Sequence, residues 1–365
     1  MIVAFYLPQF HPIPENDEWW GTGFTDWSNV TKSRPRFRGH YQPHVPSELG
    51  YYDLRDPEIR ARQASLAASA GIAGFAYYHY WFNGHQLLEG PLADVLASHE
   101  PDFPFMIVWA NENWTRSWDG GNNTILIDQR YSASDDRDHI RALRPILMDP
   151  RYMRHGERPV VAIYRVSRLP NARATADIWR EEAQSWGLSD LYLLSVESCG
   201  DPVSDPRTFG FDAAVEFHPQ WNNMPMSRPR FALRRVLRPL TPRFSNIVLH
   251  YDDLAHRASA LPDADYPRWP GVIPGFDNSP RRQRDAVIVT DSSPATYQRW
   301  LERALGRSAR TGETYRDTDG GFVFINAWNE WGEGSHLEPD ERFGRGFLDA
   351  TRNALRAAKG LNPQA

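Results

Sequence analysis

The chain has 365 residues, 41% of them hydrophobic and 24% charged, which is the composition of a soluble globular protein with a sizeable core. Its formal net charge of −5 gives no reason to expect binding to nucleic acid or to an anionic membrane. The single cysteine, Cys199, excludes an intrachain disulfide and a cysteine-based metal cluster, and we expect it to pack in the interior.

The beginning of the chain, residues 1–8, has the apolar pattern of a buried strand. It lacks the basic region and the small-residue cleavage site of a signal peptide. No segment is long and apolar enough to predict a transmembrane helix. As written, the sequence therefore predicts a cytoplasmic protein, and a periplasmic or secreted one if a leader has been removed.

Short apolar runs alternate with helical patterns along the whole chain. The apolar runs lie at residues 2–7, 72–78, 105–110, 160–164, 191–196, 213–217, 272–276 and 322–327. The helical patterns lie at residues 57–70, 87–98, 135–148, 175–186, 295–307 and 347–358. Strands that alternate with helices predict parallel βαβ units, and eight of them fit a closed α/β barrel of the (β/α)8 type. A doubly wound open sheet is the alternative, but no glycine-rich phosphate loop follows the first run.

Two long irregular segments, residues 11–56 and 218–269, interrupt this alternation. Loops of that length inside a compact domain are usually binding loops, and in a barrel they rise from the carboxyl ends of the strands, where active sites lie. We find no repeat and no low-complexity linker. The sequence therefore predicts a single domain over residues 1–365.

Polar and aromatic side chains follow nearly every predicted strand, and this coincidence predicts one substrate-binding mouth. We expect a carbohydrate to contact Tyr6, Trp27, Tyr78, His79, Trp109, Asn111, Glu112, Trp114, Glu197, His218, Asn329 and Trp331. Three of the tryptophans, Trp109, Trp114 and Trp331, adjoin carboxylates and are expected to be stacking platforms, because aromatic rings stack on the apolar faces of sugars. The cluster after the third strand continues to Arg116, Trp118 and Asp119. Core packing remains the alternative for more than half of the aromatic residues.

The segment 324–334 runs from an apolar strand into two carboxylates, Glu330 and Glu333. Side chains alternate along a strand, so these two would face opposite ways if the strand continued. Gly332 and Gly334 allow the backbone to leave this geometry, which could bring both carboxylates to one side of a cleft. Two glutamates among tryptophans are typical of a site that breaks a glycosidic bond. A helix N-terminus with solvated glutamates is the alternative.

The chain resembles the WbsX-like family, described as glycosyltransferase WbsX or as glycoside hydrolase family 99-like proteins. The resemblance is carried by long, tryptophan-rich strings at residues 4–12, 18–21, 23–27, 75–83, 109–119 and 326–339. It implies a (β/α)8 barrel that acts on a bacterial surface or extracellular polysaccharide. The family name records an association with O-antigen and capsule gene clusters.

A more distant resemblance, to family 99 endo-mannosidases, implies roles for the two glutamates. In those enzymes the first glutamate of a similar motif deprotonates the sugar 2-hydroxyl, which attacks the anomeric carbon, and the second is the acid/base. Carried over by motif, Glu330 is the base and Glu333 the acid/base. The acid needs a raised pKa, which we expect for Glu333 from desolvation by Trp331 and repulsion by a neighbouring carboxylate.

Glu112 is the rival for the acid. An Asn–Glu pair at a strand end is the acid/base arrangement of many retaining barrel glycosidases, and Asn111 with Glu112 fits it. Glu330 or Glu333 would then be the nucleophile across the mouth, whereas the alternative makes Glu112 a residue that binds sugar hydroxyls.

Two weaker signals concern further acidic residues and a metal. Glu197 and Glu216 are third candidates for the same cleft. His11, Asp26, His79 and Glu112 could converge on a metal ion, but no fixed metal-ligand spacing is present. We therefore expect neither a metal nor a cofactor.

Three function classes remain, all with an oligosaccharide or polysaccharide partner. A retaining glycoside hydrolase is favoured. A glycosyltransferase or transglycosidase of O-antigen or capsular polysaccharide synthesis is second, because no DxD motif with supporting basic residues is present for a nucleotide-sugar donor. A non-catalytic carbohydrate-binding barrel is third, since it would have no use for paired glutamates at a bent strand end.

Overall fold

A computed structural model describes residues 1–115, 124–198, 200, 203–225, 245–282, 284–315 and 321–360. Four residues that the sequence analysis names, Arg116, Trp118, Asp119 and Cys199, lie outside the described residues.

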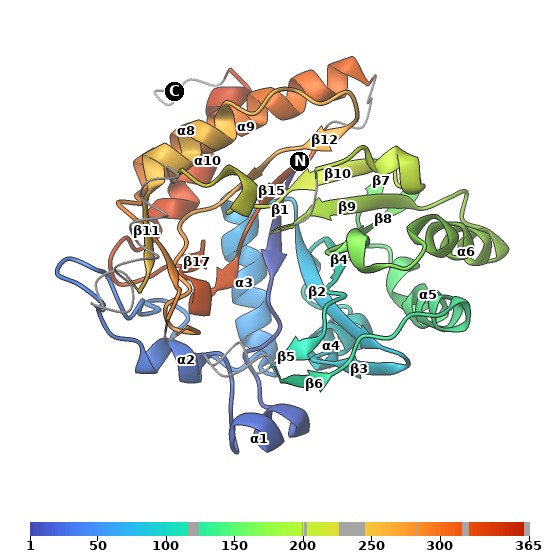
Figure 1. Cartoon of the computed structure of the whole chain (residues 1–365), viewed down its shortest axis with the longest axis horizontal. Helices are drawn as coiled ribbons and strands as arrows, with labels where there is room; N and C mark the ends of the chain where they lie inside the picture. The colour runs from blue at the N-terminus through green and yellow to red at the C-terminus, as the bar shows by residue number, and fades with distance from the viewer. Residues whose placement is uncertain are drawn as a thin grey trace.

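The centre of the molecule is a ring of parallel strands (Figure 1). In spatial order, its strands are β12 (Arg268–Trp269), β10 (Ala213–Glu216), β9 (Tyr192–Glu197), β8 (Arg158–Ile163), β4 (Phe105–Trp109), β2 (Gly74–Phe82), β1 (Ile2–Tyr6), β15 (Val323–Ile325) and β13 (Gly271–Val272). Each neighbouring pair is parallel. Only Pro270 separates β12 from β13, so this short stretch joins the two ends of the sheet. The predicted (β/α)8 barrel is confirmed.

The strands read as continuous apolar runs because both of their faces are covered. Every residue of β1 and β4 is buried. A parallel sheet covered by helices on its outer side and packed inside its ring requires this pattern, rather than the alternation of a half-exposed strand. The ring is tight at Gly271, where a Cβ atom would lie 2.0 Å from the carbonyl oxygen of Glu216. A glycine is therefore required where the last strands meet.

Helices surround the barrel at the predicted places. They are α3 (Pro57–Ser69), α4 (Gly90–Ser98), α5 (Ala133–Leu147), α6 (Ala172–Ser185), α9 (Pro294–Thr314) and α10 (Gly346–Ala358). Side-chain caps begin several of them, and Ser293 forms a full capping box at the start of α9. Helices α5 and α6 lie together on one side of the barrel, and α9 lies with α10 and α8 (Tyr251–Ser259) on another (Figure 1).

The structure differs from the sequence prediction around the seventh strand. The predicted run at 272–276 overlaps the barrel only at Val272, because the strand lies earlier, on both sides of Pro270. The segment 218–269, expected to be irregular, contains α8 and β11 (Ile247–His250). Strand β11 pairs in parallel with β14 (Val287–Thr290), in a small sheet of two strands that the sequence analysis missed.

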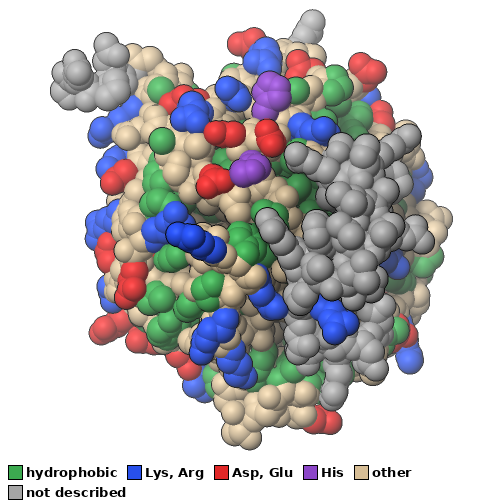
Figure 2. Space-filling model, turned by 60° about the vertical axis from the view of Figure 1, so that its left-hand side comes forward, with side chains coloured by type: hydrophobic (Ala, Val, Ile, Leu, Met, Phe, Trp, Pro, Cys, Tyr) green, Lys and Arg blue, Asp and Glu red, His purple; other side chains and the backbone are tan. Residues whose placement is uncertain are grey.

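Short elements complete the described chain. Helices α1 (Pro14–Trp20) and α2 (Trp27–Lys32) belong to the long segment 11–56. The short antiparallel pairs are β2 with β3 (His85–Leu87), β5 (Trp114–Thr115) with β6 (Ile125–Ile127), β7 (Arg154–His155) with β8, and β16 (Asn329–Glu330) with β17 (Ser335–His336). Among the helices described, none has the length and apolar character needed to cross a bilayer. Acidic and basic side chains are interspersed over the face shown in Figure 2.

Candidate active site

A cleft of about 800 Å³ lies at the carboxyl ends of the barrel strands. Its wall is rich in aromatic rings, as stacking on sugars requires. They are Tyr78, Tyr80, Trp114, Tyr131, Tyr164, Phe217, Trp221 and Phe276. The cleft therefore lies on the face of the barrel at which active sites are built.

Six of the residues that the sequence predicts for the site line this cleft: Tyr78, Asn111, Glu112, Trp114, Glu330 and Glu333. They come from three parts of the chain that are distant in sequence, namely β2, the segment after β4, and the β16–β17 hairpin. Their roles in binding and catalysis stay predictions.

Glu330 and Glu333 are presented by a tight turn. Glu330 ends β16, residues 331–333 form one turn of 3-10 helix, and Gly334 takes φ = +56°, a left-handed conformation that favours glycine. The chain then returns as β17, where Ser335 pairs with Glu330. The turn replaces the alternation of a strand, so both carboxylates reach the same cleft wall.

One buried guanidinium, that of Arg281, holds the two glutamates together. Its Nη2 lies 2.8 Å from Glu330 Oε2, and its Nη1 lies 3.1 Å from Glu333 Oε1. The same Nη2 donates to Asp26 Oδ2 at 2.8 Å, and Nε donates to Asp26 Oδ1 at 3.1 Å. Arg281 therefore faces three carboxylates with a single positive charge, and two of these carboxylates, on Asp26 and Glu330, are almost fully buried.

This imbalance of charge affects the protonation of Glu330. Burial raises the pKa of Glu330 to about 8, with Glu333 and Asp26 adding repulsion and Arg281 opposing the shift. The sequence predicts a raised pKa for Glu333, but the carboxyl group that the structure places in the more desolvated position is Glu330. The Glu333 side chain is 28% exposed at the cleft wall, where it can reach a bound molecule.

Glu112 lies at the edge of the cleft and has a partner of its own. Its Oε1 is 3.0 Å from Arg165 Nη1, and its side chain is 42% exposed. Asn111 fixes this strand end, because its Oδ1 accepts from the Arg165 backbone N–H at 2.7 Å and its Nδ2 donates to the Arg165 carbonyl at 2.9 Å. Glu112 therefore presents an exposed, ion-paired carboxylate at the cleft edge, where it can accept hydrogen bonds from a bound molecule.

Three side chains expected at the mouth of the barrel are instead buried within the protein, where each hydrogen-bonds to another residue. Tyr6 donates its hydroxyl to Gln63 Oε1 at 2.8 Å, and Trp27 donates its ring N–H to the Tyr52 carbonyl at 2.8 Å. Asn329 is fully buried, and its side-chain amide donates to the carbonyl of Leu7 at 3.0 Å. None of these three expected residues lines the cleft.

Two of the three expected tryptophan platforms are also enclosed by protein. Trp109 is 0% exposed and packs against His139 and Trp179, on the helix side of β4. Trp331 is 1% exposed and donates its ring N–H to Glu338 Oε2 at 2.6 Å. Alternation along β4 accounts for Trp109, because one face of a barrel strand must cover the surrounding helices. Trp114, at 4% exposure, is nearly as buried, but it is the one of the three that lines the cleft.

His79 also lies behind the strand, where its ring stacks on that of His139 with 5.1 Å between centroids. Its Nε2 is 3.0 Å from the Nε2 of His139. Burial lowers the pKa of His79 to about 4, so the ring is neutral at physiological pH.

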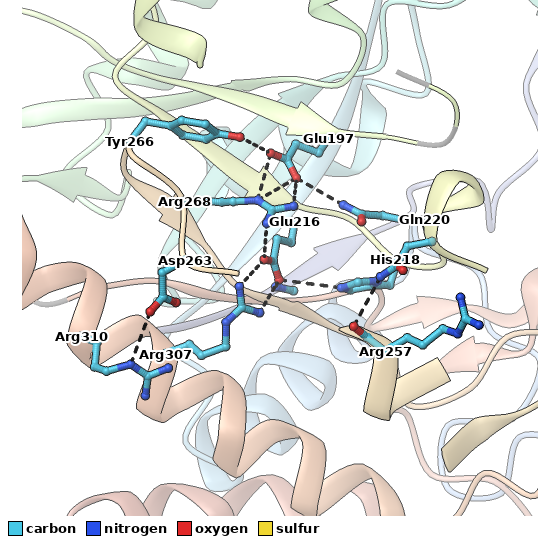
Figure 3. A network of polar contacts seen from close by, with 12 residues as sticks. Glu197, Glu216, His218, Gln220, Arg257, Asp263, Tyr266, Arg268, Arg307 and Arg310 are labelled. Atoms are coloured by element: carbon cyan, nitrogen blue, oxygen red, sulfur yellow. Dashed lines mark hydrogen bonds and ion pairs between the residues drawn. The ribbon is translucent and has the colours of Figure 1, made fainter. Parts of the chain in front are cut away.

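Glu197, Glu216 and His218 belong to a second buried network, beside the cleft wall (Figure 3). Arg268 Nε donates to both oxygens of Glu197 at 3.0 Å. Glu216 accepts from Arg307 Nη1 at 3.0 Å and lies 3.2 Å from Arg268 Nη1. His218 Nε2 lies 3.8 Å from Glu216. The structure places these three expected residues in an ion-pair network and not on the cleft.

The metal set considered from the sequence, His11, Asp26, His79 and Glu112, does not form a group in the part of the chain that the structure describes. Sequence reasoning missed Arg281, because an arginine in an irregular segment gives no local signal of its partners. Three aromatic residues of the cleft, Tyr80, Tyr164 and Trp221, were not among the expected binding residues, although each of them follows or ends a predicted strand.

A family model described as "Glycosyltransferase WbsX" matches residues 2–351, which confirms the resemblance that the sequence motifs predict. Two proteins named "Uncharacterized protein WxcX", from two strains of Xanthomonas campestris pv. campestris, are 45% identical over 358 residues. That alignment covers 98% of this chain and 50% of each relative, so the chain spans about half the length of the curated relatives it matches.

Solved structures share the fold at low sequence identity. A "Glycoside hydrolase-like protein" is 14% identical, with a TM-score of 0.61 over 97% of this chain and 93% of the other. A GH99 endo-alpha-mannosidase from Bacteroides thetaiotaomicron is 14% identical, with a TM-score of 0.60 over 99% of this chain and 98% of the other. The barrel is therefore common to all three proteins.

Proposed function

We propose that this chain, which belongs to the WbsX glycosyltransferase family of carbohydrate-active enzymes, is a retaining glycoside hydrolase. The proposed substrate is a bacterial surface or extracellular polysaccharide, and the proposed catalytic groups are Glu330 and Glu333. The chain's structural similarity to a GH99 endo-alpha-mannosidase is consistent with this chemistry.

The observation that carries the proposal is the sharing of Arg281 by the two glutamates at the wall of an aromatic cleft. Glu330 and Glu333 contact neighbouring nitrogens of one guanidinium, at 2.8 and 3.1 Å. Their carboxylates are therefore close together, as in retaining enzymes, whereas inverting enzymes separate them to admit a water molecule. The aromatic rings around them supply surfaces on which sugars stack.

The proposed roles follow the family resemblance. Glu330 takes the proton from the sugar 2-hydroxyl, and the 2-oxygen forms a bond to the anomeric carbon. The bond from that carbon to the leaving oxygen breaks as Glu333 protonates this oxygen. Water then opens the anhydro-sugar, giving its proton to Glu333 while the 2-oxygen recovers the proton from Glu330. A general base works best when its pKa lies near the working pH, and the raised pKa of Glu330 fits that role.

A different substrate would require a different role. If the reacting sugar has no suitably placed 2-hydroxyl, one carboxylate must attack the anomeric carbon directly and form a glycosyl-enzyme. Glu330, held by Arg281 at the base of the cleft, is then the nucleophile, and Glu333 remains the acid/base.

The second candidate, a glycosyltransferase or transglycosidase, is favoured by the description of the matching family model. The experiment that separates the candidates incubates the protein with bacterial polysaccharides in one arm and with nucleotide sugars plus acceptor in the other. A hydrolase produces new reducing ends and releases no nucleotide. Acceptor-dependent release of nucleotide would overturn the hydrolase in favour of the transferase.

The matched control for both arms is the double variant Glu330→Gln/Glu333→Gln, in which the carboxamides preserve the shape of the site. Activity of either kind must disappear in it. Saturable binding of an oligosaccharide by the unaltered protein without any turnover would instead assign the non-catalytic carbohydrate-binding role.

A further inference from the structure

A second group of polar side chains lies behind the turn that carries the two glutamates. His44, His336 and Asp340 each offer one ligand atom, and these atoms lie within 4.8 Å of one another. All three line a small cavity of about 80 Å³. The cluster is separate from the cleft, because none of the three residues lines that cleft.

The two histidines face each other with ring nitrogens. His44 Nδ1 lies 2.8 Å from His336 Nε2. The other nitrogen of His336, Nδ1, is 3.1 Å from the carbonyl oxygen of Glu338 and donates its hydrogen there. That hydrogen bond leaves the lone pair of the ring on Nε2, where it faces His44 Nδ1. A metal-binding histidine is commonly oriented by such a bond from its other nitrogen to a backbone carbonyl.

Asp340 supplies an oxygen that has no donor. The residue is 2% exposed, and its Oδ1 accepts from the Phe343 backbone N–H at 2.6 Å. Its Oδ2 is buried without a hydrogen-bond partner among the described residues and lies 4.0 Å from His336 Nε2. A buried carboxylate oxygen left unsatisfied costs free energy, which a bound cation would offset.

We propose that His44, His336 and Asp340 bind one divalent transition metal ion of the Zn²⁺ type. Two imidazole nitrogens and one carboxylate oxygen are ligands that Zn²⁺ prefers, and bonds of about 2.0–2.2 Å in tetrahedral geometry set ligand atoms roughly 3.3 Å apart. The observed separations of 2.8 and 4.0 Å lie on both sides of that value, so small side-chain rotations suffice. Because His44 is only half-buried, solvent can reach the cluster, and a water molecule would supply the fourth ligand.

The ion would position the neighbouring turn and take no part in the chemistry. The His336 ring stacks on Trp331, with 3.7 Å between centroids and 13° between planes. Gly334, two residues before His336, packs closely against His44, because a Cβ atom at Gly334 would lie 3.3 Å from His44 Cε1. A metal bound by His44 and His336 would thus join the segment 11–56 to the β16–β17 hairpin that presents Glu330 and Glu333.

The test uses Zn²⁺ and Co²⁺ added to protein that has been treated with a chelator and dialysed. We expect calorimetry to give one Zn²⁺ per chain, Co²⁺ to give the visible absorption of a four-coordinate site, and Zn²⁺ to raise Tm. His44→Ala and Asp340→Asn should each weaken Zn²⁺ binding by about 100-fold or more, since even outer-shell changes cost 10–100-fold. Both should abolish the Co²⁺ absorption.

The controls separate this site from the surface and from the proposed catalysis. His250→Ala removes an exposed histidine that pairs with Asp291, and it should bind Zn²⁺ as the unaltered protein does. Glu330→Gln should also bind Zn²⁺ normally, so the metal site is tested independently of the proposed hydrolase activity. Lack of Zn²⁺ binding by the folded protein, or full binding by His44→Ala and Asp340→Asn, would overturn the proposal and leave a hydrogen bond between two neutral histidines.

Discussion

Two buried clusters of carboxylates and arginines lie at the carboxyl ends of the barrel strands, and they differ in their balance of charge. Beside β9 and β10, Glu197 and Glu216 are matched by Arg268 and Arg307 (Figure 3). At the cleft, by contrast, Arg281 is the one arginine among the described residues that pairs with Asp26, Glu330 and Glu333.

The balance of charge decides the protonation of the buried carboxyls. Burial opposes ionisation of Glu216, but the nearby His218 and the charges of Arg268 and Arg307 outweigh it and lower the pKa to about 2. Burial of Glu330 is not outweighed by Arg281, and its pKa rises to about 8. Glu216 is therefore ionised at physiological pH, whereas Glu330 can exchange a proton near neutral pH.

The largest expected effect is on activity at the unbalanced cluster. Glu330→Gln and Glu333→Gln should each lower kcat by about 10²–10⁴-fold, because an amide neither transfers the proton nor carries the charge. A substrate with an activated leaving group should restore bond cleavage in Glu333→Gln but not in Glu330→Gln. Steady-state kinetics on both substrates measure this.

Glu112→Gln is the matched comparison for these kinetics. As a binding residue it should mainly raise KM, because it contacts ground and transition states alike. If Glu112→Gln shows the leaving-group rescue while Glu333→Gln is nearly normal, the pair across the cleft is the catalytic one.

The balanced cluster should respond in stability. Glu216→Gln leaves Arg307 buried without its partner and should lower the free energy of unfolding by about 3–5 kcal/mol, measured by urea denaturation. Adding Arg307→Met to that variant should recover part of the loss. Glu330→Gln should change stability by less than about 1 kcal/mol at pH 6, because the amide resembles the neutral acid already present. Equal losses in both clusters would refute the contrast.

The tryptophans offer a second comparison, because Trp109 and Trp114 are both buried, at 0% and 4% exposure, but only Trp114 lines the cleft. Trp114→Ala should weaken oligosaccharide binding by about 1–3 kcal/mol, the range for losing a large aromatic contact at a site. Trp109→Ala should instead lower the free energy of unfolding by about 3–5 kcal/mol, because it leaves a cavity beside His139 and Trp179. Calorimetric binding and urea denaturation on both variants distinguish the roles, and normal binding by Trp114→Ala would assign that ring to packing.

The smallest effect, about tenfold per pH unit, concerns the pH dependence of kcat/KM. If Glu330 is the base, it must be ionised. In Glu333→Gln, which lacks the acid and is assayed with an activated substrate, kcat/KM should therefore rise with pH and level off above about 8. A fall in kcat/KM of this variant as pH passes 8 would reverse the roles and make Glu330 the acid.

The sequence predicted the barrel well because its evidence is local. Seven of the eight apolar runs coincide with barrel strands, since a strand covered on both faces needs apolar residues throughout. The seventh run was misplaced because the true strand contains Arg268 and Pro270, and the arginine is acceptable there only through its ion pairs with Glu197 and Glu216.

Only part of the candidate site was predicted, because its carboxylates pair with arginines that are distant in sequence and that local patterns do not indicate. The spacing of Glu330 and Glu333 and the glycines beside them were sufficient to predict that both line the cleft. Whether a buried carboxyl is protonated or ionised depends on arginines from distant parts of the chain, as on Arg281 for Glu330 and on Arg307 for Glu216. Sequence patterns record which residues follow a strand, but not which of these side chains turns toward the cleft.

Gly332 limits how this site can be altered. A Cβ atom there would lie 2.5 Å from Asp26 Oδ2 and 2.6 Å from Arg281 Nε. Every other amino acid would therefore displace the ion pair on which both glutamates depend, and a randomised library should return only glycine at this position among active clones. Variation of the cleft is better directed to lining residues from other segments, such as Arg168 and Trp221.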